Sequence, residues 1–243
     1  MTYCLAIRTE SGIVFAADSR TNAGVDHIST YSKMSIFELP GRLFVLLSAG
    51  NLATTQAVVN RVQRDLEEPE TTLNLGTVKH LLDAARYIGK LSVAAQEEHA
   101  GALEKSGISP ECSFILGGQI YGAPHDVHLI YPQGNSITAS PSTPYLQIGE
   151  IKYGKPILDR VLTAHTNLGD AARCALVSLD STMRSNISVG PPVELALFQR
   201  DVLRIDRHLV LEADSPEFVA IKDAWGAAIQ QGFSSLPRFD WER

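Results

Sequence analysis

The sequence predicts an α+β protein in which two antiparallel sheets pack face to face and helices cover both outer sides. Two observations support this fold class. Short apolar strands come in pairs joined by tight turns, and each group of strands is followed by two segments with apolar residues at helical spacing. The same order of strands and helices returns in the second half of the chain, which is typical of layered sheets covered by helices.

The first half of the chain contains four expected strands and two expected helices. The strands are apolar or alternating, and turns at residues 10–12 and 40–41 separate them, whereas the polar residues 19–31 are expected to form a loop. A helix opens after Asn51, a suitable N-cap, and a longer one starts at about Thr77. The expected strands span residues 3–8, 12–18, 33–39 and 42–48.

The second half repeats this order and ends in an apolar tail. The tail, residues 234–243, follows Phe233 and carries Leu236, Phe239 and Trp241, whereas a free tail is normally polar. We therefore expect it to dock on this subunit or on a neighbour. Strands are expected at residues 112–117, 127–131, 145–148, 193–198 and 203–211, and helices at about 153–164, 170–183 and 216–231.

Composition predicts a single-domain protein and argues against several classes of function. The 243 residues, 44% hydrophobic and free of linker-like segments, are expected to form a single domain over residues 1–243. The net charge is −6 and the basic residues are scattered, which argues against nucleic-acid binding. Cys4, Cys112 and Cys174 stand far apart, as reduced thiols of a cytoplasmic protein do, and the apolar stretch near Leu5 is too short for a signal peptide or membrane span. The seven dispersed histidines and the setting of the glycines predict no metal and no cofactor.

Thr2 is the first candidate for catalysis. Removal of Met1 would leave a residue with both a free α-amine and a hydroxyl. A threonine hydroxyl needs a base before it becomes a useful nucleophile, and an α-amine has an ordinary pKa of about 8, close to working pH. The nucleophile and its base would then be one residue, although many ordinary proteins also begin with Met-Thr.

Asp18 and Lys33 are candidates for the support of Thr2. Asp18 ends one expected strand and Lys33 begins the next, so neighbouring strands would bring both to the mouth of the sandwich beside Thr2. A buried ammonium held by a carboxylate can relay the hydroxyl proton and lower the pKa of the amine. Taken singly, Asp18 is equally a turn carboxylate and Lys33 equally a solvated cation.

Gly50 is the candidate donor to an oxyanion. It lies between the end of a strand and the start of a helix, where a backbone N–H faces a substrate and the helix dipole favours negative charge. One such donor contributes about 3–4 kcal/mol to stabilisation of a tetrahedral intermediate. A simple strand-to-helix turn also accounts for a glycine here.

Together these motifs resemble a known family. The start at Thr2, residues 12–20 (GIVFAADSR), Lys33 and residues 48–50 (SAG) are similar to a proteasome-type β-subunit, which is an N-terminal-nucleophile hydrolase. Residues 18–27 (DSRTNAGVDH) and 47–55 (LSAGNLATT) resemble more narrowly Anbu, the bacterial ancestral-type β-subunit. The resemblance in element order covers nearly the whole chain.

The resemblance implies a four-layer αββα sandwich and a threonine-type peptidase or amide hydrolase. It implies Thr2 as nucleophile and amine base, an Asp18–Lys33 pair that supports it, and the Gly50 amide as oxyanion donor. It also implies a homo-oligomer, either ring-like and closed or open and helical. The sequence carries no signal for an ATPase partner or a physiological substrate.

Two positions depart from the family pattern. Glu150 stands where a serine that supports the amine is expected, and its carboxylate would hold the Thr2 ammonium and weaken it as a base. Residues 185–190 (SNISVG) keep the serine of the family motif as Ser188, a candidate catalytic residue, but Ser185 replaces the aspartate. We therefore expect weak activity on generic peptides.

Two further functions stay open, and the pocket residues are expected on loops. A non-catalytic structural ring subunit would keep the fold without turnover, and an amidase for a small amide would use the same chemistry as a peptidase. The substrate-binding candidates on the loop beside Lys33 are Arg20, Asn22 and Tyr31, and Glu150 joins them from the second half.

Overall fold

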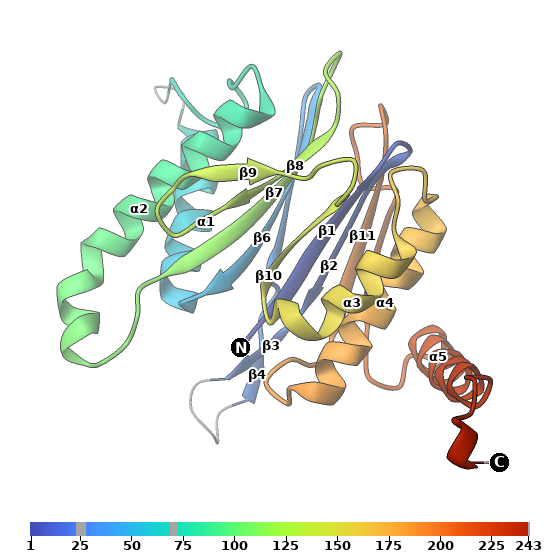
Figure 1. The fold of residues 1–243 in the computed structure, drawn as a ribbon. Coiled ribbons are helices and arrows are strands. Elements are labelled where there is room, and N and C mark those ends of the chain that lie inside the picture. The colour runs from blue at the N-terminus through green and yellow to red at the C-terminus, as the bar shows by residue number, and fades with distance from the viewer. Residues whose placement is uncertain (23–27, 69–71, 243) are drawn as a thin grey trace.

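The computed structural model describes residues 1–22, 28–68 and 72–242, without the side chains of residues 22, 28, 99, 102 and 104. Its elements form four layers, a pair of helices, two sheets and a second pair of helices (Figure 1). This confirms the predicted αββα sandwich of two antiparallel sheets. None of the helices in the described ranges is both long and apolar enough to cross a membrane.

The first sheet carries the start of the chain on β1, an interior strand next to its edge. Its strand order is β10-β1-β2-β11-β12, and all neighbours are antiparallel. In β1 the register pairs Tyr3 with Gly149, so the chain enters the sheet at the end of β10. The strands are β1 (Tyr3–Thr9), β2 (Gly12–Asp18), β10 (Tyr145–Gly149), β11 (Val193–Gln199) and β12 (Arg207–Leu211).

The second sheet has the order β5-β6-β7-β8-β9 and is also antiparallel. Its longest strands, β6 and β7, run side by side through nine residue pairs that end at Gly50 and Cys112. The strands are β5 (Met34–Leu39), β6 (Arg42–Gly50), β7 (Cys112–Ile120), β8 (Asp126–Ile130) and β9 (Ser136–Thr138).

The helices cover the outer faces of the sheets. Figure 1 shows α1 (Leu52–Glu67) and α2 (Leu81–Lys105) over the second sheet, and α3 (Ile151–Val161) and α4 (Leu168–Ser185) over the first. The last helix, α5 (Pro216–Ser234), contacts α4 and is followed by a short 3₁₀ turn at Asp240–Glu242. Apolar clusters fill the three spaces between the four layers.

Alternate side chains of β1 and β2 point to opposite faces of the first sheet, so each strand contributes to two apolar clusters. Leu5 and Val14 point to the cluster under α3 and α4, whereas Cys4 and Phe15 point to the cluster between the sheets. The two sheets lie so close that a Cβ on Gly117 would be 2.6 Å from the Phe15 ring. Both faces of the first sheet are therefore buried at β1 and β2, which explains the almost continuous apolar run of β2.

Three expectations about elements were wrong in part. Residues 19–31 are not all loop, because β3 (Arg20–Asn22) pairs with β4 (Ile28–Thr30) as a small two-stranded arm. The second helix begins at Leu81, since the N–H groups of Thr77 and Val78 bond instead to the Asn74 carbonyl in a preceding turn.

The third concerns the expected strand over residues 203–211, which begins only at Arg207. Asp201 and Leu203 have φ of 67° and 57°, and this left-handed backbone is incompatible with a strand. The short strand β9 was not predicted. It adds three residues to an edge, too few for a period-2 pattern to be recognised in the sequence.

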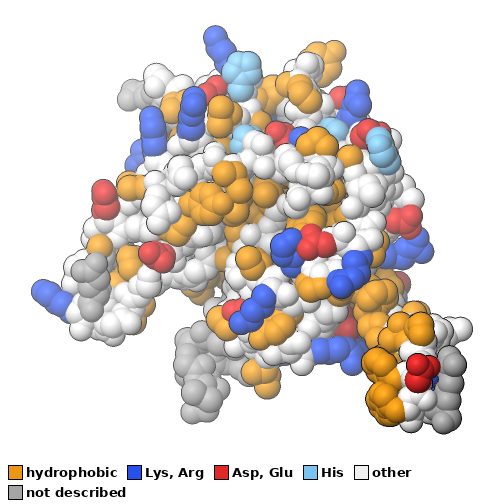
Figure 2. Space-filling model, viewed as in Figure 1, with side chains coloured by type: hydrophobic (Ala, Val, Ile, Leu, Met, Phe, Trp, Pro, Cys, Tyr) orange, Lys and Arg blue, Asp and Glu red, His pale blue; other side chains and the backbone are white. Residues whose placement is uncertain are grey.

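The C-terminal tail is exposed in the single chain. Phe233, Leu236, Phe239 and Trp241 are 58–79% exposed, and Figure 2 shows hydrophobic side chains gathered at this end of the molecule. The rings of Phe239 and Trp241 stack with centroids 5.4 Å apart. The expected docking of the tail on this subunit or on a neighbour stays a prediction.

Candidate active site

One cavity of about 480 Å³ opens where β1 begins. Its walls come from the ends of strands in both sheets, from β3 of the two-stranded arm, from the start of α1 and from the residue that precedes α3. Elements far apart in the sequence thus meet at one mouth of the sandwich. Five of the predicted site residues line this cavity: Thr2, Arg20, Lys33, Gly50 and Glu150.

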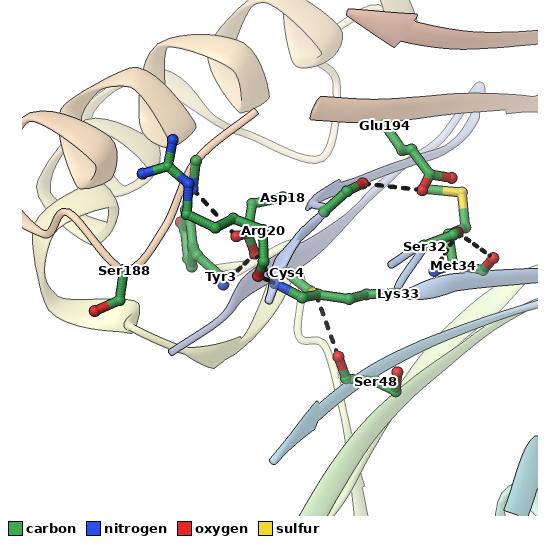
Figure 3. A network of polar contacts seen from close by, with 12 residues as sticks. Tyr3, Cys4, Asp18, Arg20, Ser32, Lys33, Met34, Ser48, Ser188 and Glu194 are labelled. Carbon is green, nitrogen blue, oxygen red and sulfur yellow. Dashed lines mark hydrogen bonds and ion pairs between the residues drawn. The ribbon is translucent and has the colours of Figure 1, made fainter. Parts of the chain in front are cut away.

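Asp18 and Lys33 form a buried ion pair at this cavity. Lys33 Nζ lies 2.6 Å from Asp18 Oδ1 and donates a second hydrogen bond of 2.7 Å to the carbonyl oxygen of Arg20. The Asp18 side chain is fully buried and Lys33 is 7% exposed. Figure 3 shows the Lys33 side chain running along the strand ends toward Asp18. The predicted pairing of these two residues is therefore present.

Two backbone amides complete the surroundings of Asp18. Tyr3 N–H donates to Oδ1 at 2.9 Å and Gly190 N–H donates to Oδ2 at 3.2 Å. Burial raises the pKa of the Asp18 carboxyl above its usual range, and the Lys33 ammonium and the two amides oppose this rise. Donors from three parts of the chain thus fix the carboxylate that orients Lys33.

Thr2 is held by its backbone next to this pair. Its carbonyl oxygen accepts a 2.8 Å hydrogen bond from Glu150 N–H, one step beyond the last pair of the β1–β10 ladder. Gly149 has a φ of +83°, and a Cβ there would lie 2.7 Å from the Thr2 carbonyl carbon. Only glycine allows this approach, so the sequence at the end of β10 sets the position of Thr2.

Met1 enters the same cavity ahead of Thr2. Burial lowers the pKa of its amine below the usual value, the charge of Lys33 lowers it further, and the carboxylates of Asp18 and Glu150 act in the opposite direction. An amine at this place therefore experiences the field of the ion pair. Met1 is 61% exposed although it lines the cavity.

Gly50 is the last residue of β6 and forms the opposite wall. Its φ is +115°, and a Cβ there would lie 2.7 Å from Cys112 Cα and even closer to the Glu111 carbonyl oxygen. Asn51 then caps α1, because its Oδ1 accepts from Thr54 N–H at 3.2 Å. The first turn of α1 thus directs its N-terminal dipole at the cavity, where negative charge is favoured.

No protein-family model and no curated protein matches the chain. Among solved structures, Anbu (ancestral beta-subunit) from Yersinia bercovieri is 44% identical to it, with 98% of each chain covered and a TM-score of 0.91. The chain belongs to the Anbu family. The helical assembly of the Anbu complex from Pseudomonas aeruginosa is 45% identical, with 98% of each chain covered and a TM-score of 0.92. Anbu from Hyphomicrobium sp. strain MC1 is 44% identical over 98% of this chain and 99% of that one, with a TM-score of 0.88.

Two predicted site residues of this Anbu chain lie away from the cavity. Tyr31 is not part of the lining, and its N–H bonds to the Ser19 carbonyl oxygen at the base of the arm. Ser188 also lies outside the lining, and Figure 3 shows it set apart from Asp18 and Lys33. The Asn22 side chain lies outside the described residues. The roles expected for Ser188 and Tyr31 stay predictions.

Arg20 lines the cavity, but its guanidinium does not point freely at a substrate. Nη1 donates to the carbonyl oxygen of Ile187 at 2.7 Å, while the backbone carbonyl of Arg20 holds Lys33. The substrate-binding role expected for Arg20 stays a prediction, and its guanidinium is already hydrogen-bonded to the Ile187 carbonyl oxygen. Glu150 differs, since it lines the cavity of this Anbu subunit and its side chain makes no capping hydrogen bond to α3.

The backbone donors to Asp18 and a second buried polar pair were not predicted from the sequence. The N–H groups of Tyr3 and Gly190 leave no trace in residue types, although Gly190 ends the motif in which Ser188 was singled out. Ser19 and Glu194 are also buried, and Ser19 Oγ donates to Glu194 Oε1 at 3.1 Å. A glutamate inside the apolar strand β11 could have predicted this pair, because a buried carboxylate needs a hydrogen-bond partner.

Proposed function

We propose that this Anbu subunit is a threonine-type N-terminal-nucleophile hydrolase that cleaves an amide bond in a peptide or a small amide. Thr2 becomes the nucleophile once Met1 has been removed. The observation that carries the proposal is the Lys33 ammonium, which Asp18 and the Arg20 carbonyl hold in the cavity that Thr2 lines. A cation placed in this way favours the neutral amine and the alkoxide that the reaction needs.

The reaction proceeds in two halves. The Thr2 amine takes the hydroxyl proton as Oγ bonds to the amide carbon, and the oxyanion that forms is stabilised at the Gly50 amide and the start of α1. The proton passes to the leaving nitrogen, the C–N bond breaks, and an ester on Oγ remains. Water, deprotonated by the same amine, then attacks the ester, and the acid leaves as Oγ regains its proton.

We further propose that the subunit acts in the cytoplasm as a homo-oligomer, ring-like or open and helical. The relative from Pseudomonas aeruginosa forms a helical assembly, and the exposed apolar tail here offers a surface for a neighbour. The three cysteines are buried and free, as expected in a reducing compartment.

Labelling with a peptide epoxyketone tests the nucleophile. The reagent needs both groups of the leading residue, since the hydroxyl attacks the ketone and the amine opens the epoxide. We expect Met1-free wild-type protein to gain the mass of the reagent on Thr2, and Thr2→Ala to gain none. Thr2→Ser, which keeps both groups, is the matched control and should be labelled. Intact mass spectrometry with peptide mapping provides both measurements, including the state of Met1.

Absence of an adduct on Met1-free wild-type protein, or equal labelling of Thr2→Ala, would contradict the proposal. A non-catalytic structural subunit would then be the better reading. Complete retention of Met1 in protein purified from its native host would point the same way, because an acylated nitrogen cannot act as a base. Turnover of small amides without any peptide cleavage would select the amidase form.

Glu150 gives a separate prediction about pH. Its carboxylate raises the pKa of the chain-terminal amine, opposing burial and Lys33. The reaction needs the neutral amine, so its rate rises with pH as the ammonium is lost. Glu150→Gln removes a charge that favours the ammonium, and we expect the rising limb of the pH–rate profile for adduct formation to move to lower pH. An unmoved limb, or one moved to higher pH, would show that Glu150 does not act on the amine.

A further inference from the structure

The side chain of Arg20 lies across residues 187–190, the segment that leads from α4 toward β11. Nη1 donates to the Ile187 carbonyl oxygen at 2.7 Å, and the Arg20 N–H donates to the Gly190 carbonyl oxygen at 3.3 Å. The guanidinium also covers Gly190, because a Cβ built there would lie 2.6 Å from Nη2. Arg20 thus contacts this segment at both ends.

Gly190 connects the segment to the ion pair. Its N–H donates to Asp18 Oδ2 at 3.2 Å, while Asp18 Oδ1 accepts from Lys33 at 2.6 Å. A bond of 3.2 Å is at the long end of the usual range for N–H···O, so a small shift of the segment would break it. The position of Gly190 therefore decides whether the second oxygen of Asp18 has a donor.

We propose that Arg20 is a positioning residue for the candidate active site. Its side chain fixes residues 187–190 so that the Gly190 N–H holds Asp18, and Asp18 in turn orients Lys33 at the cavity. The link to catalysis rests on the proposed function, whereas the effect of Arg20 on Asp18 is a property of the fold alone.

The geometry favours packing over charge as the means by which Arg20 acts. The planar guanidinium lies against a residue without a side chain, and its Nε is buried without a hydrogen-bond partner among the described residues. A lysine would keep the positive charge but has no flat group to cover Gly190 and reach Ile187 at once. We therefore expect Arg20→Lys to behave like Arg20→Ala.

A double-mutant cycle isolates this contact. The φ of Gly190 lies outside the left-handed region, so the backbone permits alanine, and the new Cβ conflicts with the guanidinium of Arg20. We expect Arg20→Ala and Gly190→Ala each to slow adduct formation by about tenfold, as for the loss of one well-placed hydrogen bond. The double variant should be no slower than either single variant, because both changes remove the same contact. Arg200→Ala, on an exposed arginine that pairs with Asp201, is the control and should leave the rate unchanged.

The titration of Asp18 provides a readout that does not need activity. With ¹³C-labelled aspartate and Asp18→Asn for assignment, we expect the pKa of Asp18 to rise in Arg20→Ala, Arg20→Lys and Gly190→Ala, because the Gly190 N–H stabilises the ionised carboxylate. Thermal unfolding of each variant shows that the fold is kept. An unchanged pKa, rescue by lysine, or additive rate losses would overturn the proposal. If wild-type protein forms no adduct at all, the proposed function fails, and the Asp18 titration still decides this inference.

Discussion

Replacement of Lys33 by methionine is expected to slow adduct formation and turnover by about 10²- to 10⁴-fold, the usual contribution of a positioned proton-transfer group. Lys33 and Arg20 are the basic side chains among the described lining residues, and the Arg20 guanidinium is bonded to the Ile187 carbonyl oxygen. Methionine has a similar length but supplies neither charge nor donor. Burial still lowers the pKa of the leading amine, but the further lowering by the Lys33 charge is lost, so the rising limb of the pH–rate profile should move to higher pH.

The same change should lower the free energy of unfolding. Loss of one partner from a buried pair costs about 3–5 kcal/mol, because the other charge stays without compensation. Burial already raises the pKa of Asp18, and without Lys33 it rises further, so the carboxyl takes up a proton as the pH falls. A raised folded-state pKa stabilises the fold at low pH and loses that effect as pH rises. The deficit of the variant should therefore be larger at neutral than at mildly acidic pH.

Urea unfolding at several pH values measures this deficit. Lys155→Met is the matched control, because its ammonium lies 2.8 Å from Asp159 Oδ2 but both side chains are about half exposed. An exposed pair of this kind contributes about 1 kcal/mol or less. Equal deficits for the two variants, or a deficit at Lys33 that does not depend on pH, would contradict the role of the buried pair.

Alanine at Gly50 is expected to damage both catalysis and the fold. The φ of +115° is unfavourable for any side chain, and the new Cβ would overlap with the backbone of Glu111 and Cys112 on the paired strand. The backbone must move away, and with it the amide proposed to stabilise the oxyanion. Removal of one oxyanion donor costs about 10²- to 10³-fold in rate.

Gly122→Ala separates the two causes of this effect. Gly122 also has a positive φ, +77°, but nothing lies within 4 Å of a Cβ there. It should show only the cost of backbone strain, about 1–2 kcal/mol, with normal adduct formation. Hydrogen exchange across the Gly50–Cys112 end of the β6–β7 ladder should increase in Gly50→Ala alone. A Gly50→Ala protein with wild-type exchange and labelling would exclude Gly50 from the site.

The parts of this structure that were predictable depend on local chemistry. The apolar run of β2 ends at Asp18, and Asn51 caps α1 as its residue type suggests. Because strand ends gather at one edge of a sandwich, the meeting of Asp18 and Lys33 also followed from their places along the chain. These features are encoded within a few residues of each other or by the alternation of a strand.

The parts that were not predictable depend on backbone groups and long-range packing. Nothing in residue type shows that the Gly190 N–H, 172 positions from Asp18, completes its carboxylate. The sequence motif singled out Ser188, whose role stays a prediction, whereas the observed contact with Asp18 comes from the backbone of Gly190 at the end of that motif. The sequence likewise does not show that the Arg20 guanidinium donates a hydrogen bond to the Ile187 carbonyl oxygen, 167 positions away.

The anchoring of Thr2 has a practical consequence for recombinant work. The Thr2 carbonyl oxygen accepts a hydrogen bond from Glu150 N–H, and Tyr3 pairs with Gly149 in the β1–β10 ladder. The backbone is therefore fixed in the sheet up to Thr2. Any affinity tag fused ahead of Met1 would thread outward through the mouth of the cavity and obstruct it. A preparation that carries such an extension would look inert whatever its chemistry, so a cleavable fusion that exposes Thr2 directly is the format to express.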